Sequence, residues 1–186
     1  MTVVGPDGHP RCSWAVSAPE YMSYHDEEWG KPIRDDHGLY ERITLEAFQS
    51  GLSWITILRK RANFRAAFAG FDPQSVAAYG PADFDRLMAD PGIVRNRLKI
   101  NAAIANARAL LELDKGALTE LLWSFAPVDR PAPKTNADVP ATTPESVEMS
   151  KALKKNGFVF IGPTTCYALM QATGIVNDHL AGCICR

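Results

Sequence analysis

Apolar residues at helical spacing are the feature that most restricts how this chain of 186 residues can fold. Residues 93–113 show the pattern most clearly, because their apolar positions recur three and four residues apart and so share one face of a helix. These positions are Ile100, Ile104, Ala107 and Leu111. The most strand-like segment, residues 157–162, is short and isolated. The sequence therefore predicts an all-α fold.

Capping residues, prolines and glycines predict where the helices begin and end. Asp35 and Asp36 are suited to start a helix that Gly51 stops, and Thr143 is suited to cap another. The expected helices cover residues 36–50, 53–68, 81–89 and 93–113, one that begins at Pro144, and one from about Thr164 to Gly174. A tight turn is expected at Asp90–Gly92, and the proline-rich residues 127–143 are expected to form a crossing loop.

Composition indicates a compact globular protein, with 46% apolar and 22% charged residues. At this length we expect one domain over residues 1–186, with the first ten residues flexible. The net charge of −1 does not mark the whole molecule as a polyanion binder. Half of the cations nevertheless gather in three clusters, which are either solvated helix faces or one basic surface. The clusters are Arg59, Lys60, Arg61 and Arg65; Arg95, Arg97 and Lys99; and Lys151, Lys154 and Lys155.

No apolar run approaches the roughly 20 residues that a membrane-spanning helix needs. The first residues, MTVVGPDGHPRC, lack the apolar core of a signal peptide. We therefore expect a cytoplasmic protein without a membrane partner, and nothing in the sequence implies a protein partner. In a reducing compartment the four cysteines are expected to bind a metal or to be buried as thiols.

A carboxylate occurs on the apolar face of the helix expected over residues 36–50. At 3.6 residues per turn, Glu46 shares the stripe of Leu39 and Ile43. An unpaired buried carboxylate is costly, so Glu46 is expected to find a partner, to take up a proton, or to face a cavity where a ligand compensates it. The simpler alternative is a glutamate at the edge of the stripe, paired with a nearby arginine or tyrosine.

Aromatic residues are dense around this segment. Trp54 follows the break at Gly51, and four more rings occur upstream: Trp14, Tyr21, Tyr24 and Trp29. Such residues belong to a core more often than to a binding site. Ring faces and a carboxylate both favour positive charge once water is excluded, however, so this combination suits a pocket for a flat cationic base.

Two pairs of metal-binding residue types lie near opposite ends of the chain. His179 and Cys183 are one turn apart if their segment is helical, and Cys12 and His25 offer a second pair. No sequence rule forces the pairs together. If they bind one ion, four protein ligands leave no open position, which favours a structural zinc that joins the N- and C-terminal segments. Cys185 is a rival to Cys183, and each of these side chains could instead be simply buried.

Three long stretches resemble the type I, constitutive 3-methyladenine DNA glycosylases of bacteria, which belong to the helix-hairpin-helix glycosylase superfamily. The stretches are RCSWAVSAPEYMSYHDEEWG, LEAFQSGLSWITILRKR and SKALKKNGFVFIGPTTCYALMQATGIVNDHLAGC. The resemblance extends from about Arg11 to Cys183. It implies a bacterial, nucleoid-associated enzyme of base-excision repair that flips 3-methyladenine out of alkylated double-stranded DNA. Hydrolysis of the N-glycosidic bond would leave an abasic site.

The resemblance also implies roles for individual residues. Glu46 is expected to be the catalytic carboxylate, and Trp54 is expected to stack on the base. Further base-binding rings would be Tyr21, Tyr24 and Trp14. DNA contacts are expected at Gly51 and Leu52, at the hairpin residues Gly92, Ile93 and Val94, and at the cations Lys151 and Lys154. The zinc ligands would be Cys12, His25, His179 and Cys183.

The sequence departs from the family pattern at Ala47, where a glycine is expected, and this alanine would narrow the pocket. The family itself lacks the catalytic aspartate that most of its superfamily carries after the hairpin, and no substitute is evident here. Less chemistry is required of such an enzyme, because methylation at N3 already makes adenine cationic and weakens its glycosidic bond. No lysine stands out as a Schiff-base nucleophile, which favours a monofunctional enzyme.

Two other functions fit part of the pattern. A non-catalytic helix-hairpin-helix module would share the cations and the zinc, but it would gain nothing from a desolvated acid at position 46. A zinc hydrolase would lose its chemical step on chelation, whereas a structural ion matters mainly for folding.

Overall fold

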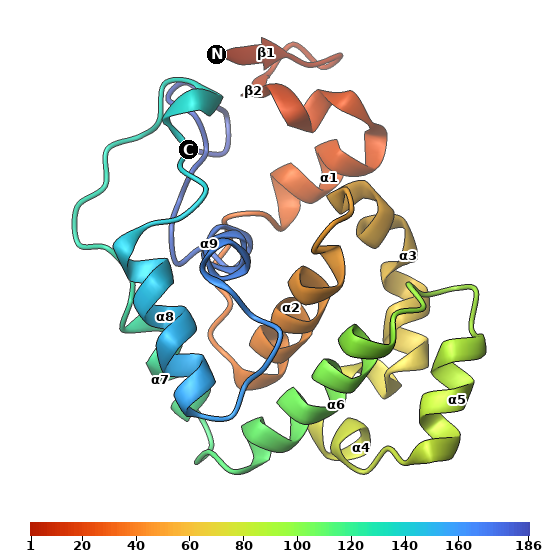
Figure 1. The fold of residues 1–186 in the computed structure, drawn as a ribbon. Coiled ribbons are helices and arrows are strands. Elements are labelled where there is room, and N and C mark those ends of the chain that lie inside the picture. Colours follow the sequence, from red (N-terminus) through yellow and green to blue (C-terminus); the bar gives the residue numbers. More distant parts are fainter.

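The computed structural model describes residues 1–186 and is built mainly of helices (Figure 1). The α-helices are α1 (Pro19–Glu27), α2 (Asp36–Gln49), α3 (Trp54–Ala67), α4 (Pro73–Ala77), α5 (Pro81–Ala89), α6 (Arg97–Leu111), α7 (Ala117–Trp123), α8 (Pro144–Lys155) and α9 (Pro163–Ala172). Short 3-10 helices occur at Ser13–Ser17, Ala69–Phe71 and Asn136–Asp138. The predicted helical class is therefore confirmed. None of the helices combines the length and the apolar character needed to cross a membrane.

A two-stranded antiparallel sheet adds to the predicted helices. Strand β1 (Thr2–Val4) pairs with β2 (Pro10–Cys12). The first ten residues, which we expected to be flexible, thus contain a paired strand. The C-terminal segment lies beside this sheet, where the N–H of Ile184 donates to the carbonyl of Pro10 at 2.8 Å.

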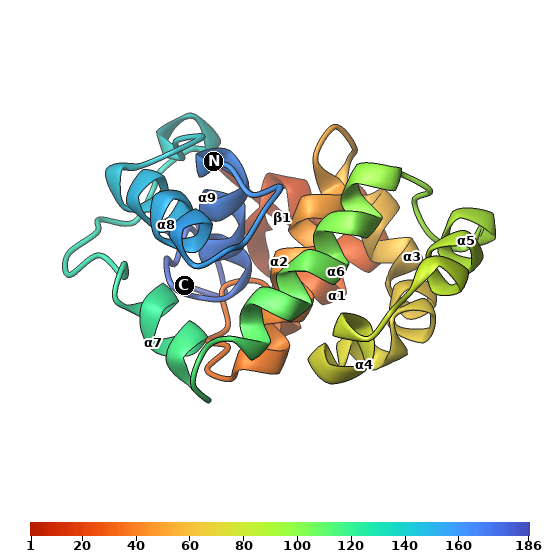
Figure 2. The ribbon, with the colours of Figure 1, turned by 60° about the horizontal axis from the view of Figure 1, so that its bottom comes forward.

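Helix α2 is central to the arrangement of the other helices. It packs against α3 and α6 on one side and against α7 and α9 on the other (Figures 1 and 2). One continuous hydrophobic core joins both sides, and it contains the neighbouring rings of Phe48, Phe64 and Phe68. The C-terminal turn of α2 is therefore held between two groups of helices.

Capping chemistry explains which helix starts were predicted well. The Asp35 carboxylate accepts from the Gly38 N–H at 2.7 Å at the start of α2, and the Thr143 hydroxyl accepts from the Ser146 N–H at 3.2 Å at the start of α8. These bonds satisfy N–H groups that a helix leaves without partners. Both starts agree with the sequence prediction.

The start of α6 was predicted wrongly. We expected a helix from Ile93, but α6 begins at Arg97, because the Asn96 side chain accepts from the Lys99 N–H at 3.1 Å and caps the helix there. The preceding residues lengthen the hairpin between α5 and α6 instead. In the predicted turn itself, the Gly92 N–H donates to the Asp90 carboxylate at 2.7 Å.

Candidate functional site

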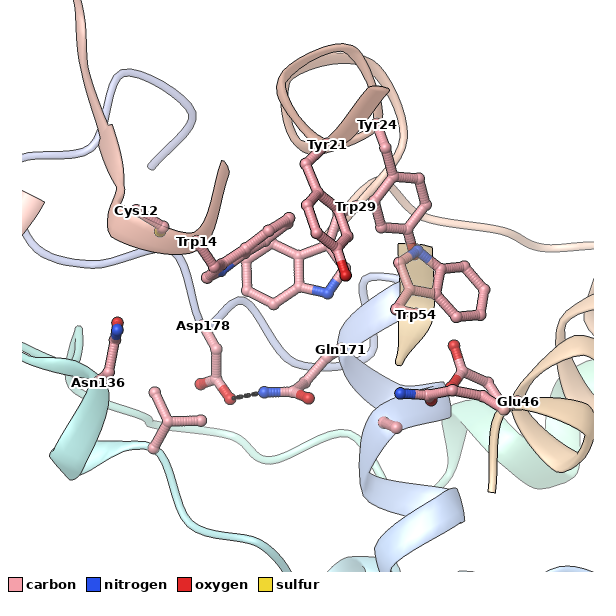
Figure 3. Close-up of a pocket in the computed structure, with 13 residues that line it drawn as sticks. Cys12, Trp14, Tyr21, Tyr24, Trp29, Glu46, Trp54, Asn136, Gln171 and Asp178 are labelled. Carbon is pink, nitrogen blue, oxygen red and sulfur yellow. Dashed lines mark hydrogen bonds between the residues drawn. The ribbon is translucent and has the colours of Figure 1, made fainter. Parts of the chain in front are cut away.

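A cavity of about 440 Å³ opens where the end of α2 faces α1, α3 and α9 (Figure 3). The rings that line it are Trp14, Tyr21, Tyr24, Trp29 and Trp54, and its polar residues are Glu46, Gln49, Asn136, Gln171 and Asp178. A volume of this size lies in the usual range for small-molecule sites. The predicted acid and all four predicted rings therefore meet in one hollow.

Glu46 is buried, with only 5% of the residue exposed, and it lies on the last turn of α2. No hydrogen bond within the protein engages its carboxylate. Burial raises the pKa of Glu46 to about 8, while the positive charge of Arg42 lowers it in part. The structure thus contains an unpaired acid facing a cavity, and not the paired glutamate of the simpler alternative.

Arg42 does not neutralise Glu46 because another carboxylate engages it. Its Nη2 donates to Oε2 of Glu28 at 2.6 Å. Arg61 donates to both oxygens of Glu28, at 2.5 and 2.7 Å. The two arginines share the single carboxylate of Glu28, and neither forms a salt bridge with Glu46, so the acid in the cavity has no ion-pair partner of its own.

Two rings stand over the acid in Figure 3, one from α1 and one from α3. The centroids of Tyr24 and Trp54 are 5.3 Å apart, and their planes are inclined by 43°. Gly51, in the left-handed conformation at φ +80°, ends α2 and lets the chain turn so that Trp54 begins α3. The Tyr21 hydroxyl accepts from the N–H of Ile55 at 2.9 Å, which fixes the start of α3 against α1.

Trp14 connects this cavity with the group of metal-binding residues. Its ring lies edge-on to Tyr21, with centroids 5.6 Å apart, and also edge-on to Trp29 and His25, each at 5.1 Å. The cavity wall and the cysteine–histidine group therefore share a side chain, and a change in one is expected to disturb the other.

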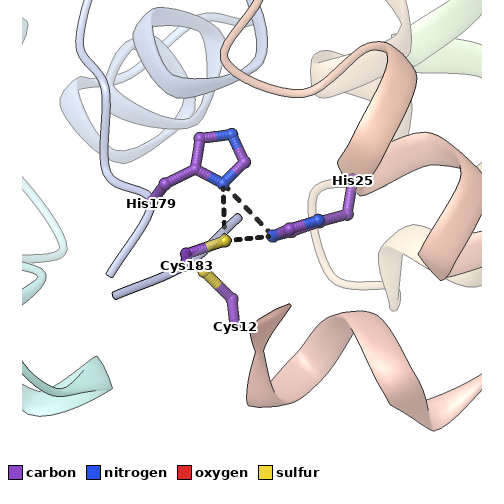
Figure 4. Close-up of side chains that lie close together, drawn as sticks. All are labelled: Cys12, His25, His179 and Cys183. Carbon is purple, nitrogen blue, oxygen red and sulfur yellow. Dashed lines mark hydrogen bonds between the residues drawn. The ribbon is translucent and has the colours of Figure 1, made fainter. Parts of the chain in front are cut away.

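Cys12, His25, His179 and Cys183 form one buried group whose ligand atoms all lie within 4.8 Å of one another (Figure 4). His25 Nε2 is 3.2 Å from His179 Nδ1 and 3.4 Å from Cys183 Sγ. Tetrahedral zinc with Zn–N and Zn–S bonds of ordinary length requires ligand atoms roughly 3.3–3.8 Å apart. The group is therefore able to hold a metal ion.

The other nitrogen of each imidazole already has a partner. His25 Nδ1 lies 2.7 Å from the Asp26 carboxylate, and His179 Nε2 lies 3.1 Å from the Trp29 carbonyl. Such contacts fix the ring orientation and leave the opposite nitrogen for a metal. Burial lowers the pKa of His179 to about 4 and also lowers that of His25, so both rings are neutral at pH 7, the form that binds metal.

The local geometry of His179 and Cys183 differs from the expected helical turn. Helix α9 ends at Ala172, and a turn at Gly182, with φ +86°, brings the two side chains together. Cys185 does not join the group of four. Its Sγ lies 3.6 Å from the Asp26 carboxylate and 3.8 Å from Nδ1 of His25, on the far side of that ring.

Seven residues that line the cavity were given no role from the sequence: Trp29, Gln49, Asn136, Val139, Ala168, Gln171 and Asp178. The density of rings upstream of Glu46 was a usable signal for Trp29. Asp178, next to a predicted ligand, is buried and accepts from Gln171 Nε2 at 2.9 Å and from the Tyr167 hydroxyl at 2.5 Å. No local pattern could have shown that Asn136, from the proline-rich loop, reaches the cavity. Ala47 is buried and does not line it.

The residues expected to contact DNA lie outside the cavity. Gly51 and Leu52 are exposed between α2 and α3, with 41% of Leu52 accessible. Lys151 and Lys154 are exposed on α8, and Lys151 pairs with Glu148 at 2.7 Å. Gly92, Ile93 and Val94 belong to the hairpin between α5 and α6.

The first basic cluster is not a set of free surface cations, as a basic surface would require. Arg59 pairs with Glu20, Arg61 with Glu28, and Arg65 with Glu41. The partner acids come from α1, from the residue directly after it and from α2, so the sequence around the cluster could not predict these pairs.

Fold and site together define a helical protein with an aromatic, acid-bearing pocket and a hairpin between two helices. The sequence pattern of the methyladenine glycosylase family matches residues 14–186 of the chain. The chain belongs to this family.

Individual relatives agree with this assignment. DNA-3-methyladenine glycosylase 1 of Escherichia coli (strain K12) is 49% identical over 181 residues, which cover 94% of this chain and 96% of that protein. A crystal structure of 3-methyladenine DNA glycosylase I has a TM-score of 0.90 at 46% identity, covering 95% of this chain and 99% of that one. A structure that describes 3-methyladenine recognition by 3-methyladenine DNA glycosylase I from Staphylococcus aureus has a TM-score of 0.88 at 34% identity. The match covers 94% of this chain and 95% of that one.

Proposed function

We propose that this protein is a monofunctional DNA glycosylase of base-excision repair that removes 3-methyladenine from alkylated double-stranded DNA. The observation that carries this proposal is the unpaired Glu46 carboxylate, buried in a cavity under the rings of Tyr24 and Trp54. Family membership supports the same function. A non-catalytic DNA-binding module would have no use for such a desolvated acid.

The chemistry follows from the charge of the lesion. N3-methylated adenine in DNA is cationic, so its glycosidic bond is weakened and the base departs neutral. An ionised Glu46 favours the positive charge of the extruded base and of the sugar as the bond breaks, and water exclusion strengthens this interaction. The rings of Trp54 and Tyr24 favour the same charge. Tyr21 and Trp14 complete the wall of the base pocket.

Access to the base requires the nucleotide to leave the stack, at a cost of a few kcal/mol. Leu52, exposed beside Gly51, is suited to fill the vacancy. The backbone N–H groups of Ile93, Val94 and Arg95 donate to no acceptor within the protein, so they are suited to bind a phosphate as Gly92 brings the hairpin close. Lys154 and Lys151 would add sequence-independent attraction to the backbone.

The lining of the cavity supports a monofunctional reaction. None of its residues is a lysine, so no amine is placed to form a Schiff base with the sugar. The expected product is therefore an abasic site in an intact strand.

We also propose that Cys12, His25, His179 and Cys183 bind one structural zinc ion. The buried position, the neutral imidazoles and the spacing of the ligand atoms support this ion. Bound zinc would join the two ends of the chain and, with four protein ligands, would leave no position for a reacting water.

Methylated duplex DNA provides the test of this function. The purified protein is incubated with the duplex, and the released bases are identified by chromatography. Release of 3-methyladenine with no strand cleavage, and no protein–DNA adduct after borohydride treatment, is the expected result. Absence of released base would refute the glycosylase, whereas a trapped adduct would refute the monofunctional reaction.

A further inference from the structure

Lys99 is a buried lysine in the first turn of α6, directly after the hairpin, and only 6% of it is exposed. Its ammonium has no carboxylate partner. It donates instead to the carbonyl oxygens of Phe48, at 2.8 Å, and Ser50, at 2.5 Å. Burying a cation without a counter-ion is costly, and burial lowers the pKa of Lys99. Lys99 therefore does not belong to an exposed basic surface, although the sequence groups it with Arg95 and Arg97 in one of the three basic clusters.

The acceptors of Lys99 lie at the end of α2. A helix leaves its last carbonyl groups unpaired and carries partial negative charge there. The N–H groups of Ser50 and Leu52 satisfy Ala47 and Gln49, at 3.3 and 2.6 Å. Lys99 supplies the donor that the remaining carbonyls need, so a residue of α6 completes the cap of α2.

Lys60 makes the reciprocal connection from α3. Its ammonium donates to the carbonyls of Pro91, at 2.9 Å, and Gly92, at 3.3 Å. Lys99 of α6 therefore binds the end of α2, just before the Gly51–Leu52 loop. Lys60 of α3, the helix after that loop, binds the hairpin between α5 and α6.

We propose that Lys99 is a positioning residue that fixes the Gly51–Leu52 loop relative to the hairpin. A hairpin docked on the DNA backbone then delivers Leu52 to the place of the extruded nucleotide. The base pocket is built from Glu46 and the rings, none of which Lys99 contacts, so its role concerns the duplex and not recognition of the base. This inference rests on the proposed function.

The first test compares Lys99→Met with the wild-type protein on two substrates. Excision of 3-methyladenine from methylated duplex DNA under single-turnover conditions is expected to fall about 10- to 100-fold, since misplacement of a group by about 1 Å costs that much. Binding of free 3-methyladenine, followed by tryptophan fluorescence, is expected to remain within about twofold of wild type. A purely structural role would lower both together or neither.

A double-mutant cycle tests whether Lys99 acts through the loop. Leu52→Ala alone is expected to lower duplex excision about tenfold, because the vacancy is no longer filled. In the Lys99→Met background, Leu52→Ala is expected to add little, since the loop is already misplaced. Fully multiplicative effects would overturn the inference.

Lys115→Met, which removes an exposed lysine far along the chain, is the matched control for loss of one charge and is expected to leave excision unchanged. If Lys99→Met does not fold, Lys99→Gln, which retains an uncharged N–H donor group, is measured in the same way, with an intermediate loss of duplex excision expected. Wild-type excision by a folded Lys99 variant overturns this inference alone. Failure of the wild-type protein to release 3-methyladenine overturns the proposed function instead.

Discussion

Glu46 is suited to bind a cation, but burial of its carboxylate also destabilises the folded state when the group is ionised. Its carboxylate is buried without a hydrogen bond, and its pKa is raised from 4.5 to about 8. Until a cation enters the cavity, ionisation of Glu46 works against folding. This coupling gives the side chain a measurable signature without any DNA.

The sign of that signature follows from linkage. The folded-state pKa of Glu46 lies above the unfolded one, so its contribution to stability is fully present below about pH 4.5 and is lost as the pH rises through about 8. The free energy of unfolding of wild type minus that of Glu46→Gln is therefore expected to fall with pH, by at most about 1.4 kcal/mol per unit. Denaturant unfolding of both proteins between pH 5 and 9 measures this difference. A difference independent of pH would show that the acid is solvated.

Catalytic rate is expected to depend on pH in the opposite sense. Because the ionised carboxylate favours the cationic base, single-turnover excision at subsaturating protein, which reports the free protein, should rise as the pH rises toward about 8 and level off above it. Glu46→Gln should remove this rise. Equal pH profiles for the two proteins would assign the titration to another group.

Some site residues could be found from the sequence and others could not. Glu46 was visible as a carboxylate on an apolar stripe, and the rings near it were visible as a cluster. Gln171 and Asn136 enter the cavity from segments far along the chain, where neither periodicity nor motif marks them. Their contribution arises only from the way α9 and the proline-rich loop pack around α2.

Caps or proline starts helped to predict α2, α5 and α8, but α1 and α4 also begin at a proline and were not predicted. The bounds of α5 agree with the sequence, whereas α6 starts four residues late because Asn96 captures an N–H group further along. Helices α1, α4 and α7 were missed, and the five and seven residues of α4 and α7 are too few for a clear periodicity. The cross-connections of Lys60 and Lys99 depend on tertiary contacts alone.

The junction between α9 and the segment before α2 depends on Gly174. This residue has φ +73°, and an added Cβ would lie 2.8 Å from backbone atoms of Gly30, Lys31 and Pro32. Gly174→Ala is expected to cost at least about 3 kcal/mol of unfolding free energy, since both the conformation and the space exclude a side chain. Urea unfolding measures the cost.

Gly116 provides the matched control for this effect. Its φ is +87°, but an added Cβ would meet no atom within 4 Å. Gly116→Ala is therefore expected to cost only about 1 kcal/mol, from backbone strain. Equal losses for the two variants would mean that the close approach at Gly174 is unimportant.

For the whole molecule, the proposed zinc ion joins the two chain ends and leaves the central core to the helices. Removal of the metal with a chelator is expected to lower Tm by roughly 10 °C or more, because several kcal/mol of binding free energy is lost. Far-UV circular dichroism should still report most of the helix content. A chelator-treated protein with unchanged Tm would contradict the structural role.

Cys183 and Cys185 form a matched pair for the same question. Cys183→Ser is expected to abolish the stoichiometric zinc measured by elemental analysis, because this thiol belongs to the group of four. Cys185→Ser is expected to retain the ion, because its thiol faces the other nitrogen of His25. Loss of zinc from Cys185→Ser and its retention by Cys183→Ser would show that Cys185, and not Cys183, is the ligand.

The central claim is that an unpaired acid in an aromatic cavity favours a purine that carries a positive charge. Its most direct test is single-turnover release of 3-methyladenine from methylated duplex DNA by wild type, Glu46→Gln and the exposed control Glu120→Gln. Loss of one preorganised electrostatic group typically costs about 10²- to 10³-fold in rate, and a decrease of that order is expected for Glu46→Gln alone. Release by Glu46→Gln at the wild-type rate would contradict the account.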